Sequence, residues 1–282
     1  MPRLHAKHRT EIRYAGVAGE SVNEIRLSPV DNGRQQVEWA HVRVEPGAEL
    51  FGHRDVYGNE VRWFQLVGPH GSLVVESEAV VVTRPAPALP ISVWGVGFAA
   101  VAEPDYLDAM AEFLAGSPHV RWTRPVGAFA DALGLDQDEG VLAWARALEG
   151  AINSTIAYTR GATQVDTPVE EVVAVGRGVC QDMAHLMIAI CRRHGVASRY
   201  VSGWLYQPGS EGPGESHAWV EAAVPGAGWV ELDPTHPAPR HERYVRLATG
   251  RDYSDVPPLK GSYHGPATEE MTVSVEVREL PS

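Results

Sequence analysis

A cysteine, a histidine and an aspartate stand in three short segments of this chain, in that order. Cys180 ends the run Gly176-Arg177-Gly178-Val179-Cys180, His217 lies in Ser216-His217-Ala218-Trp219, and Asp233 lies in Leu232-Asp233-Pro234-Thr235. A thiolate is a strong nucleophile, an imidazole can take the proton of the thiol, and a carboxylate can orient the imidazole. The three residues therefore predict an enzyme that transfers acyl groups through cysteine.

The residues around Cys180 predict that it stands at the start of a buried helix. All but one of the residues 183–191 are apolar, and they recur at helical spacing. Gly176 and Gly178 suit a tight turn into that helix. The free amides and the dipole of the first turn would favour a thiolate. We expect the backbone amides of Cys180 and Gln181 to form an oxyanion hole.

His217 and Asp233 fall on two predicted strands that a turn at residues 225–228 joins into a hairpin. If Ala223 faces Trp229, both side chains lie on one face and Asp233 is diagonal to His217, within reach of it. A register shifted by one residue would put them on opposite faces. The aspartate precedes a proline, so a role as a turn former only is the alternative.

These segments resemble the bacterial transglutaminase-like proteins of the papain-like cysteine hydrolase superfamily. The resemblance implies an α+β fold, in which a helix carrying the cysteine packs on an antiparallel sheet and an all-β domain precedes this core. It implies that Cys180 is the nucleophile, His217 the base and Asp233 the third member of the triad. The segments that carry it are residues 178–185, 197–204, 216–221 and 229–235, the stretch 54–61 with Asp55, Gly58 and Asn59, and residues 250–258.

Other polar or reactive side chains have simpler interpretations. Cys191 lies on the apolar stripe of the predicted helix and should pack in the core. His185 is expected on the helix surface and His194 at the helix end. His236 and His241 follow the aspartate closely, but no second set of ligands completes a zinc pattern. We therefore expect no metal site and no cofactor.

The chain divides into two predicted domains. Residues 1–83 alternate apolar and polar in short runs and predict an antiparallel β-rich module, residues 84–90 form a proline-rich linker, and residues 91–282 form the catalytic domain. Glycines in the stretch 207–215 suggest a mobile loop before His217. Helices are expected at 104–115, 126–133 and 138–158, and from a cap at Thr167 with Pro168 in the first turn; strands are expected at 198–206, 217–223, 229–232, 244–248 and 271–279.

Composition limits the functions that remain. The chain has 282 residues, 44% hydrophobic and 21% charged, which is typical of a globular protein. Its net charge of -12 argues against general binding to nucleic acid or to anionic membranes. No apolar run approaches the roughly 20 residues that span a bilayer, and no secretory signal is evident at the start. Two cysteines, one needed as a thiol, favour a reducing compartment, so we expect a cytoplasmic protein.

The predicted reaction begins with attack of Cys180 on the carbonyl of an amide bond, in a protein or peptide substrate, to give a thioester. Water would then give a peptidase or amidase, and an amine would give a transglutaminase acting on a glutamine side chain. Hydrolysis is favoured because water is always present and no amine-binding site is evident. A non-catalytic binding module that keeps the fold and a metal-dependent hydrolase remain alternatives, and the oligomeric state stays open.

Overall fold

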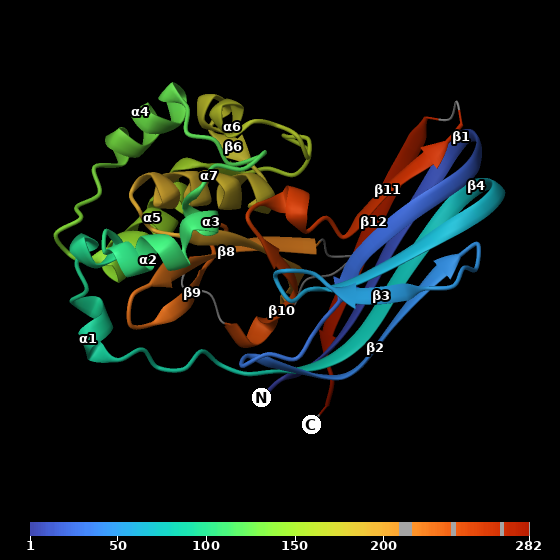
Figure 1. Cartoon of the computed structure of the whole chain (residues 1–282), viewed down its shortest axis with the longest axis horizontal. Coiled ribbons are helices and arrows are strands. Elements are labelled where there is room, and N and C mark those ends of the chain that lie inside the picture. The colour runs from blue at the N-terminus through green and yellow to red at the C-terminus, as the bar shows by residue number, and fades with distance from the viewer. Residues whose placement is uncertain (209–215, 238–240, 266–267, 282) are drawn as a thin grey trace.

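The first sheet, here called the amino-terminal sheet, is antiparallel and six-stranded and is built on two long amino-terminal strands, β1 (Arg3–Ser28) and β4 (Glu60–Thr83) (Figure 1). The computed structural model describes residues 1–208, 216–237, 241–265 and 268–281. Residues 209–215 of the predicted loop before His217 therefore lie outside the described part of the chain. Each long strand is paired along its outer edge by two shorter strands: β1 by β11 (Leu259–His264) and β12 (Glu269–Glu279), and β4 by β2 (Gln35–Glu45) and β3 (Phe51–Arg54).

Alternation of side chains explains why this region forms a sheet. Along the first part of β1, every second side chain is buried, and the residues between them are exposed or partly exposed; the buried ones are Leu4, Ala6, His8, Thr10 and Ile12. The buried face packs against Trp204 and Val245 of a second sheet. The predicted β-rich amino-terminal module is confirmed.

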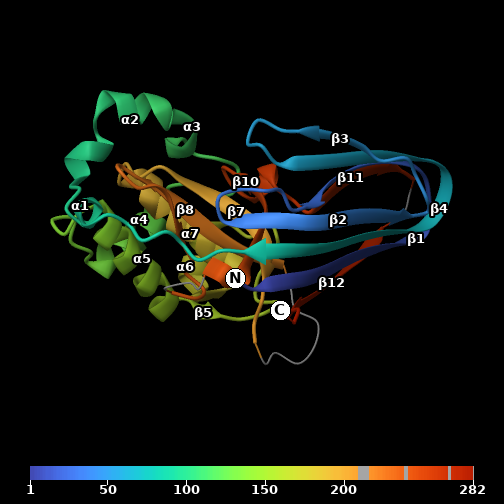
Figure 2. The same ribbon diagram turned by 90° about the horizontal axis from the view of Figure 1, so that it is seen from below.

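The second sheet is antiparallel and has the order β10-β7-β8-β9. It lies between the amino-terminal sheet and a layer of helices, because one group of its side chains packs with the helices and another with the first sheet (Figure 2). The predicted α+β class, with the cysteine helix on an antiparallel sheet, is confirmed. Its strands are β7 (Ser198–Leu205), β8 (Ser216–Val224), β9 (Gly228–Leu232) and β10 (Tyr244–Gly250).

Short helices cover the second sheet, and two longer ones, α5 and α7, form the centre of the core. The α-helices are α1 (Ile91–Trp94), α2 (Pro104–Ala109), α3 (Ala111–Leu114), α4 (Arg124–Leu133), α5 (Val141–Thr155), α6 (Val169–Val175) and α7 (Cys180–Arg193). Short 3₁₀ turns lie at Phe98–Val101, His241–Arg243 and Tyr253–Asp255, and β5 (Ala157–Tyr158) pairs in parallel with β6 (Arg177–Gly178). In the described part of the chain, no helix is both long and apolar enough to cross a membrane.

Two local predictions are wrong. The helix expected at 104–115 breaks at Met110, which separates α2 from α3. Pro168, not Thr167, caps α6, and the hydroxyl of Thr167 instead accepts a hydrogen bond from the amide of Gln164 at 2.8 Å. A threonine side chain can serve either a cap or a local turn, and here the turn takes it.

The strand predicted at residues 271–279 exists, but it does not join the strands predicted at residues 198–248 of the same catalytic domain. It lies in β12, which pairs with β1 in the first sheet. The free edge of β10 is instead covered by two amide side chains: Gln35 bonds the N–H and the carbonyl of Arg246, and Asn59 bonds those of Thr249. Alternation predicts a strand but does not say which edge accepts it. The boundary at residues 84–90 stays a prediction.

Candidate active site

Cys180 is the first residue of helix α7 and is half-buried. The preceding helix, α6, ends at Gly176, whose φ of +68° is a left-handed conformation that glycine adopts at no steric cost. Strand β6 then leads directly into α7. Among the amides of the first turn, that of Met183 donates to the carbonyl of Val179 at 3.1 Å. The amides of Cys180 and Gln181 precede this first intrahelical bond, so both remain candidates for the oxyanion hole.

Asp182 fixes the start of this helix. Its Oδ2 accepts hydrogen bonds from the amide of Val179 at 2.7 Å and from the hydroxyl of Thr163 at 2.6 Å. Gly178 permits this arrangement, because a Cβ atom there would lie 2.8 Å from the same oxygen. Burial raises the pKa of Asp182, while its two donors act in the opposite direction. Gly178 is thus needed for close approach, and not only for a turn.

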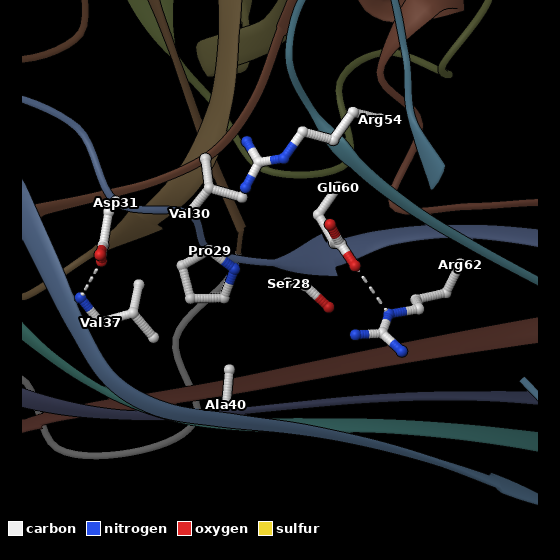
Figure 3. Close-up of a pocket in the computed structure, with 9 residues that line it drawn as sticks. All are labelled: Ser28, Pro29, Val30, Asp31, Val37, Ala40, Arg54, Glu60 and Arg62. Carbon is white, nitrogen blue, oxygen red and sulfur yellow. Dashed lines mark hydrogen bonds and ion pairs between the residues drawn. The ribbon is translucent and has the colours of Figure 1, made fainter. Parts of the chain in front are cut away.

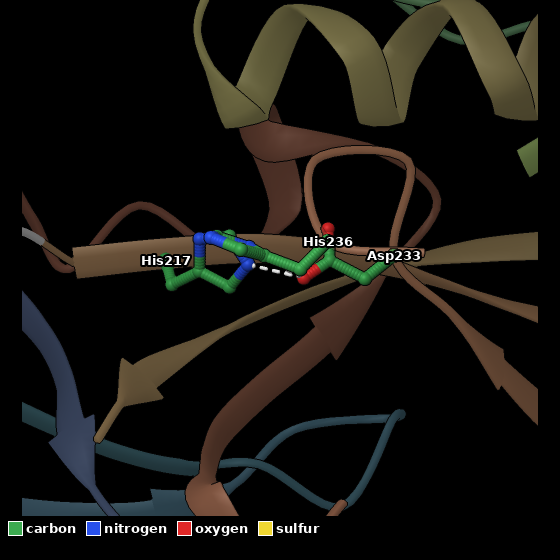
Figure 4. A group of neighbouring side chains, drawn as sticks. All are labelled: His217, Asp233 and His236. Atoms are coloured by element: carbon green, nitrogen blue, oxygen red, sulfur yellow. Dashed lines mark hydrogen bonds and ion pairs between the residues drawn. The ribbon is translucent and has the colours of Figure 1, made fainter. Parts of the chain in front are cut away.

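The β8–β9 hairpin brings His217 and Asp233 together in the register that the sequence analysis required. Ala223 pairs with Trp229, which leaves Asp233 diagonal to His217 just past the end of the ladder. The Nε2 of His217 lies 2.7 Å from the Oδ2 of Asp233. Figure 4 marks this contact with a dashed line. Asp233 is completely buried and His217 nearly so.

The side chain of Cys180 also interacts with the imidazole of His217. Since Nε2 faces Asp233, Nδ1 is the ring nitrogen left for the thiol. Burial alone would lower the pKa of His217, but Asp233 and Cys180 outweigh it and raise this pKa to about 10. Burial would raise the pKa of Asp233, but the imidazole of His217 outweighs burial and holds the pKa of this carboxyl well below its usual range. The arrangement favours an ionised imidazolium and carboxylate.

Two further side chains donate to the same oxygen of Asp233. The hydroxyl of Tyr244 lies 2.7 Å from Oδ2, and the Nδ1 of His236 lies 3.3 Å from it. The amide of Thr235 donates to Oδ1 at 2.8 Å. Burial and the neighbouring carboxylate raise the pKa of Tyr244, so its hydroxyl stays a donor. The carboxylate is held from several sides, as an orienting group should be.

Sequence reasoning missed Tyr244 and a buried acid, Glu149, whose Oε1 accepts the amide of Asp233 at 2.6 Å. The sequence predicts only that Tyr244 begins a strand. A signal for Glu149 was present, because it lies on the buried stripe of α5 together with Leu142, Ala145 and Ile152. A carboxylate at a core position of an amphipathic helix needs a partner, which indicates a buried site.

The other singled-out residues lie away from this group. Cys191 is fully buried, and burial raises the pKa of its thiol to about 12. His194 caps the end of α7, as predicted. The prediction that His185 lies on the helix surface is wrong: it is buried, stacks on His119 at 5.2 Å, and accepts the amide of Tyr253. This side of α7 is covered because Tyr200 of strand β7 packs against the ring of His185, with ring centroids 5.1 Å apart.

One group of described side chains has the geometry to hold a metal ion. Its members are His217, Asp233 and His236, whose ligand atoms lie within 4.8 Å of one another. Two of them already bond each other at 2.7 Å, so a cation would have to break that hydrogen bond. A separate pocket lies in the amino-terminal sheet and contains none of these residues (Figure 3). Its lining residues are Ser28, Pro29, Val30, Asp31, Val37, Ala40, Arg54, Glu60 and Arg62.

The fold and this site together define a papain-like α+β protein in which a cysteine, a histidine and an aspartate lie next to one another. Comparison with known families agrees. Residues 128–234 match the transglutaminase-like superfamily, and residues 4–82 match the bacterial transglutaminase-like N-terminal region. The chain belongs to the bacterial transglutaminase-like family.

Relatives of similar length carry no assigned activity. An uncharacterised protein of Mycobacterium leprae is 33% identical, with 99% of this chain and all of that protein covered. An uncharacterised protein of Mycobacterium tuberculosis (strain H37Rv) is also 33% identical, with 98% of this chain and 92% of that protein covered. The fold is shared with a "putative cysteine protease" from Cytophaga hutchinsonii, at 22% identity and a TM-score of 0.80, covering 100% of this chain and 92% of the other.

Proposed function

We propose that this protein is a cysteine-dependent enzyme that cleaves amide bonds through a thioester, with Cys180, His217 and Asp233 as its triad and water as the usual acceptor. The observation that carries the proposal is the contact chain from the thiol at the start of α7, through the imidazole, to a fully buried carboxylate. The protein substrate would offer a peptide bond or a glutamine side chain.

The proposed reaction has two halves. First, with the proton of Cys180 already held on the imidazolium of His217, the sulfur attacks the carbonyl carbon, and the amides of Cys180 and Gln181 stabilise the negative oxygen. The C–N bond breaks, the imidazolium gives its proton to the departing nitrogen, and a thioester remains. Then His217 takes a proton from water, the hydroxide attacks the thioester, and the acid leaves as the thiol is restored.

Asp233 keeps the imidazole in the required orientation throughout. It accepts from Nε2 and thereby presents Nδ1 to the thiol. Its other donors, Tyr244 and His236, reduce its freedom to turn away. Both cysteines are free thiols, and a location in a reducing compartment, the cytoplasm, is part of the proposal.

The experiment that tests the proposal uses a library of glutamine-containing peptides, with and without a primary amine, and mass spectrometry of the products. A shortened peptide indicates a peptidase, a gain of one mass unit at glutamine indicates an amidase, and a peptide–amine conjugate indicates a transglutaminase. The matched controls are Cys180→Ala, which should abolish every product, and Cys191→Ala, which should not. Product formation that survives Cys180→Ala but stops with a chelator would replace this proposal with metal-dependent hydrolysis.

A further inference from the structure

Helix α5 contacts the loop that carries Asp233 at two points on one of its faces. Glu149 accepts the amide of Asp233 at 2.6 Å through Oε1. One turn later, the Nδ2 of Asn153 donates to the carbonyl of Pro234 at 3.0 Å and to that of Thr235 at 2.9 Å. Residues four apart lie on the same face of a helix, so the two side chains together form hydrogen bonds with three successive residues of the loop, 233–235.

The loop needs such contacts because its strand has already ended. The last pair of the β8–β9 ladder joins Val220 and Leu232, so the amide of Asp233 has no strand partner. Pro234 has no N–H, which prevents the ladder from continuing. A buried amide without an acceptor would cost stability, and the carboxylate of Glu149 provides that acceptor.

Burying a glutamate is energetically unfavourable, which argues against a purely structural role for Glu149. Its side chain is buried, and burial raises its pKa against the effects of Arg146 and of the Asp233 amide. Arg146, one turn earlier on α5, forms an ion pair with it at 3.1 Å. The other ionisable groups that face it are Asp233, on the loop after β9, and Tyr244, on β10. A second negative charge behind Asp233 would help to keep His217 protonated.

We propose that Glu149 and Asn153 are positioning residues, which hold the backbone on both sides of the Asp233 side chain so that its carboxylate faces His217. The inference rests on the proposed function in one respect, that Asp233 orients the catalytic imidazole. Glu149 acts through the backbone and the charge of Asp233, and Asn153 acts through the backbone alone.

The test measures the titration of His217 by nitrogen-15 NMR of the histidine rings, with His217→Ala used to assign its signals. Variants are Glu149→Gln, Glu149→Ala and Asn153→Ala, and the matched control is Thr155→Ala, an exposed position on the same helix whose hydroxyl donates to the carbonyl of Ala151. The alkylation rate of Cys180 is recorded in parallel from pH 5 to 10. Circular dichroism shows which variants are folded.

We expect Glu149→Ala and Asn153→Ala to lower the pKa of His217 and to slow alkylation at neutral pH by up to about 100-fold, the effect of a small misplacement. Glu149→Gln keeps an acceptor for the amide of Asp233, so it should restore most of the alkylation rate. Because it removes a negative charge, the upper pH limit of the alkylation profile should shift to lower pH. Thr155→Ala should match the natural protein.

An unchanged His217 titration in folded Glu149→Ala and Asn153→Ala proteins would overturn the inference. Should Glu149→Ala fail to fold, the Gln variant and Asn153→Ala decide the question. The titration does not depend on reactivity, so the outcome stands apart from the proposed function. If Cys180 of the natural protein reacts no faster than a free thiol, the proposed function fails, while a shifted His217 titration would still support the positioning role.

Discussion

The two cysteines of helix α7 lie about three turns apart and occupy opposite environments. Cys180 is half-buried at the first helical position, beside His217. Cys191 is fully buried among apolar side chains, and burial raises its pKa to about 12. The two side chains are chemically identical, so the difference comes from the helix terminus and from the hairpin that brings the imidazole to one of them.

This difference shows how one helix serves two purposes. Its first turn supplies free amides and the positive end of the helix dipole, which favour a negative charge, whereas its later turns supply apolar surface for the core. We therefore expect substitutions at Cys180 to change reactivity with little effect on stability, and substitutions at Cys191 to do the reverse.

The largest expected effect is on turnover. Cys180→Ala should lower the hydrolysis of p-nitrophenyl acetate or of an identified peptide substrate by at least about 10⁴-fold, because the nucleophile is lost. Cys191→Ala should keep a rate close to that of the natural protein. The measurement is steady-state kinetics on both purified variants. Equal losses in the two variants would remove the distinction between the cysteines.

The next effect is on thiol reactivity at acidic pH. In the natural protein, iodoacetamide should label Cys180 rapidly even at pH 6, because His217 and its carboxylate favour the thiolate. In His217→Ala the thiol should behave as an ordinary cysteine, and labelling at pH 6 should fall by about 100-fold. Mass spectrometry of digested samples reports both cysteines, and Cys191 is the internal control. Slow labelling of both cysteines, unchanged by the substitution, would support the binding-module alternative.

Much of this contrast could be predicted from the sequence. The apolar spacing of residues 183–191 placed Cys191 in the core, and Gly176 marked the turn that ends α6. The turn at residues 225–228 predicted the hairpin and left two registers open, and the structure has the one in which Asp233 lies diagonal to His217. These features are local, and local spacing and turn chemistry report them directly.

What could not be predicted depends on contacts between distant segments. The burial of His185 requires His119 and β7, and the place of β12 depends on the edge that β1 leaves free. One donor to Asp233, the hydroxyl of Tyr244, comes from β10, and the acceptor of its amide, Glu149, comes from α5, 84 residues away in sequence. Periodicity describes the face of one element and not the element that covers it.

A smaller effect should appear in stability as a function of pH. The pKa of His217 is raised from 6.5 to about 10 in the folded protein, so its stabilising contribution is fully present below pH 6.5 and is lost as pH rises through 10. Urea denaturation should therefore show a large difference between the natural protein and His217→Gln at pH 6, and a smaller difference at pH 10.5. The exposed control His264→Gln should show no such change. A difference that stays constant with pH would mean that the imidazole is neutral in the folded state.

The smallest expected effect is on stability. Here a substitution at Cys191 should matter more than one at Cys180, the reverse of the order expected for turnover. Cys191→Ser places a hydroxyl among apolar side chains, which should lower the free energy of unfolding by about 1–3 kcal/mol. Cys180→Ser lies at a half-exposed helix start and should change it by no more than about 0.5 kcal/mol. Urea denaturation at pH 7 measures both. Because the substitution is the same at both positions, a larger loss at Cys180 would mean that its thiol is held by packing rather than presented for reaction, and the comparison between the two ends of the helix would fail.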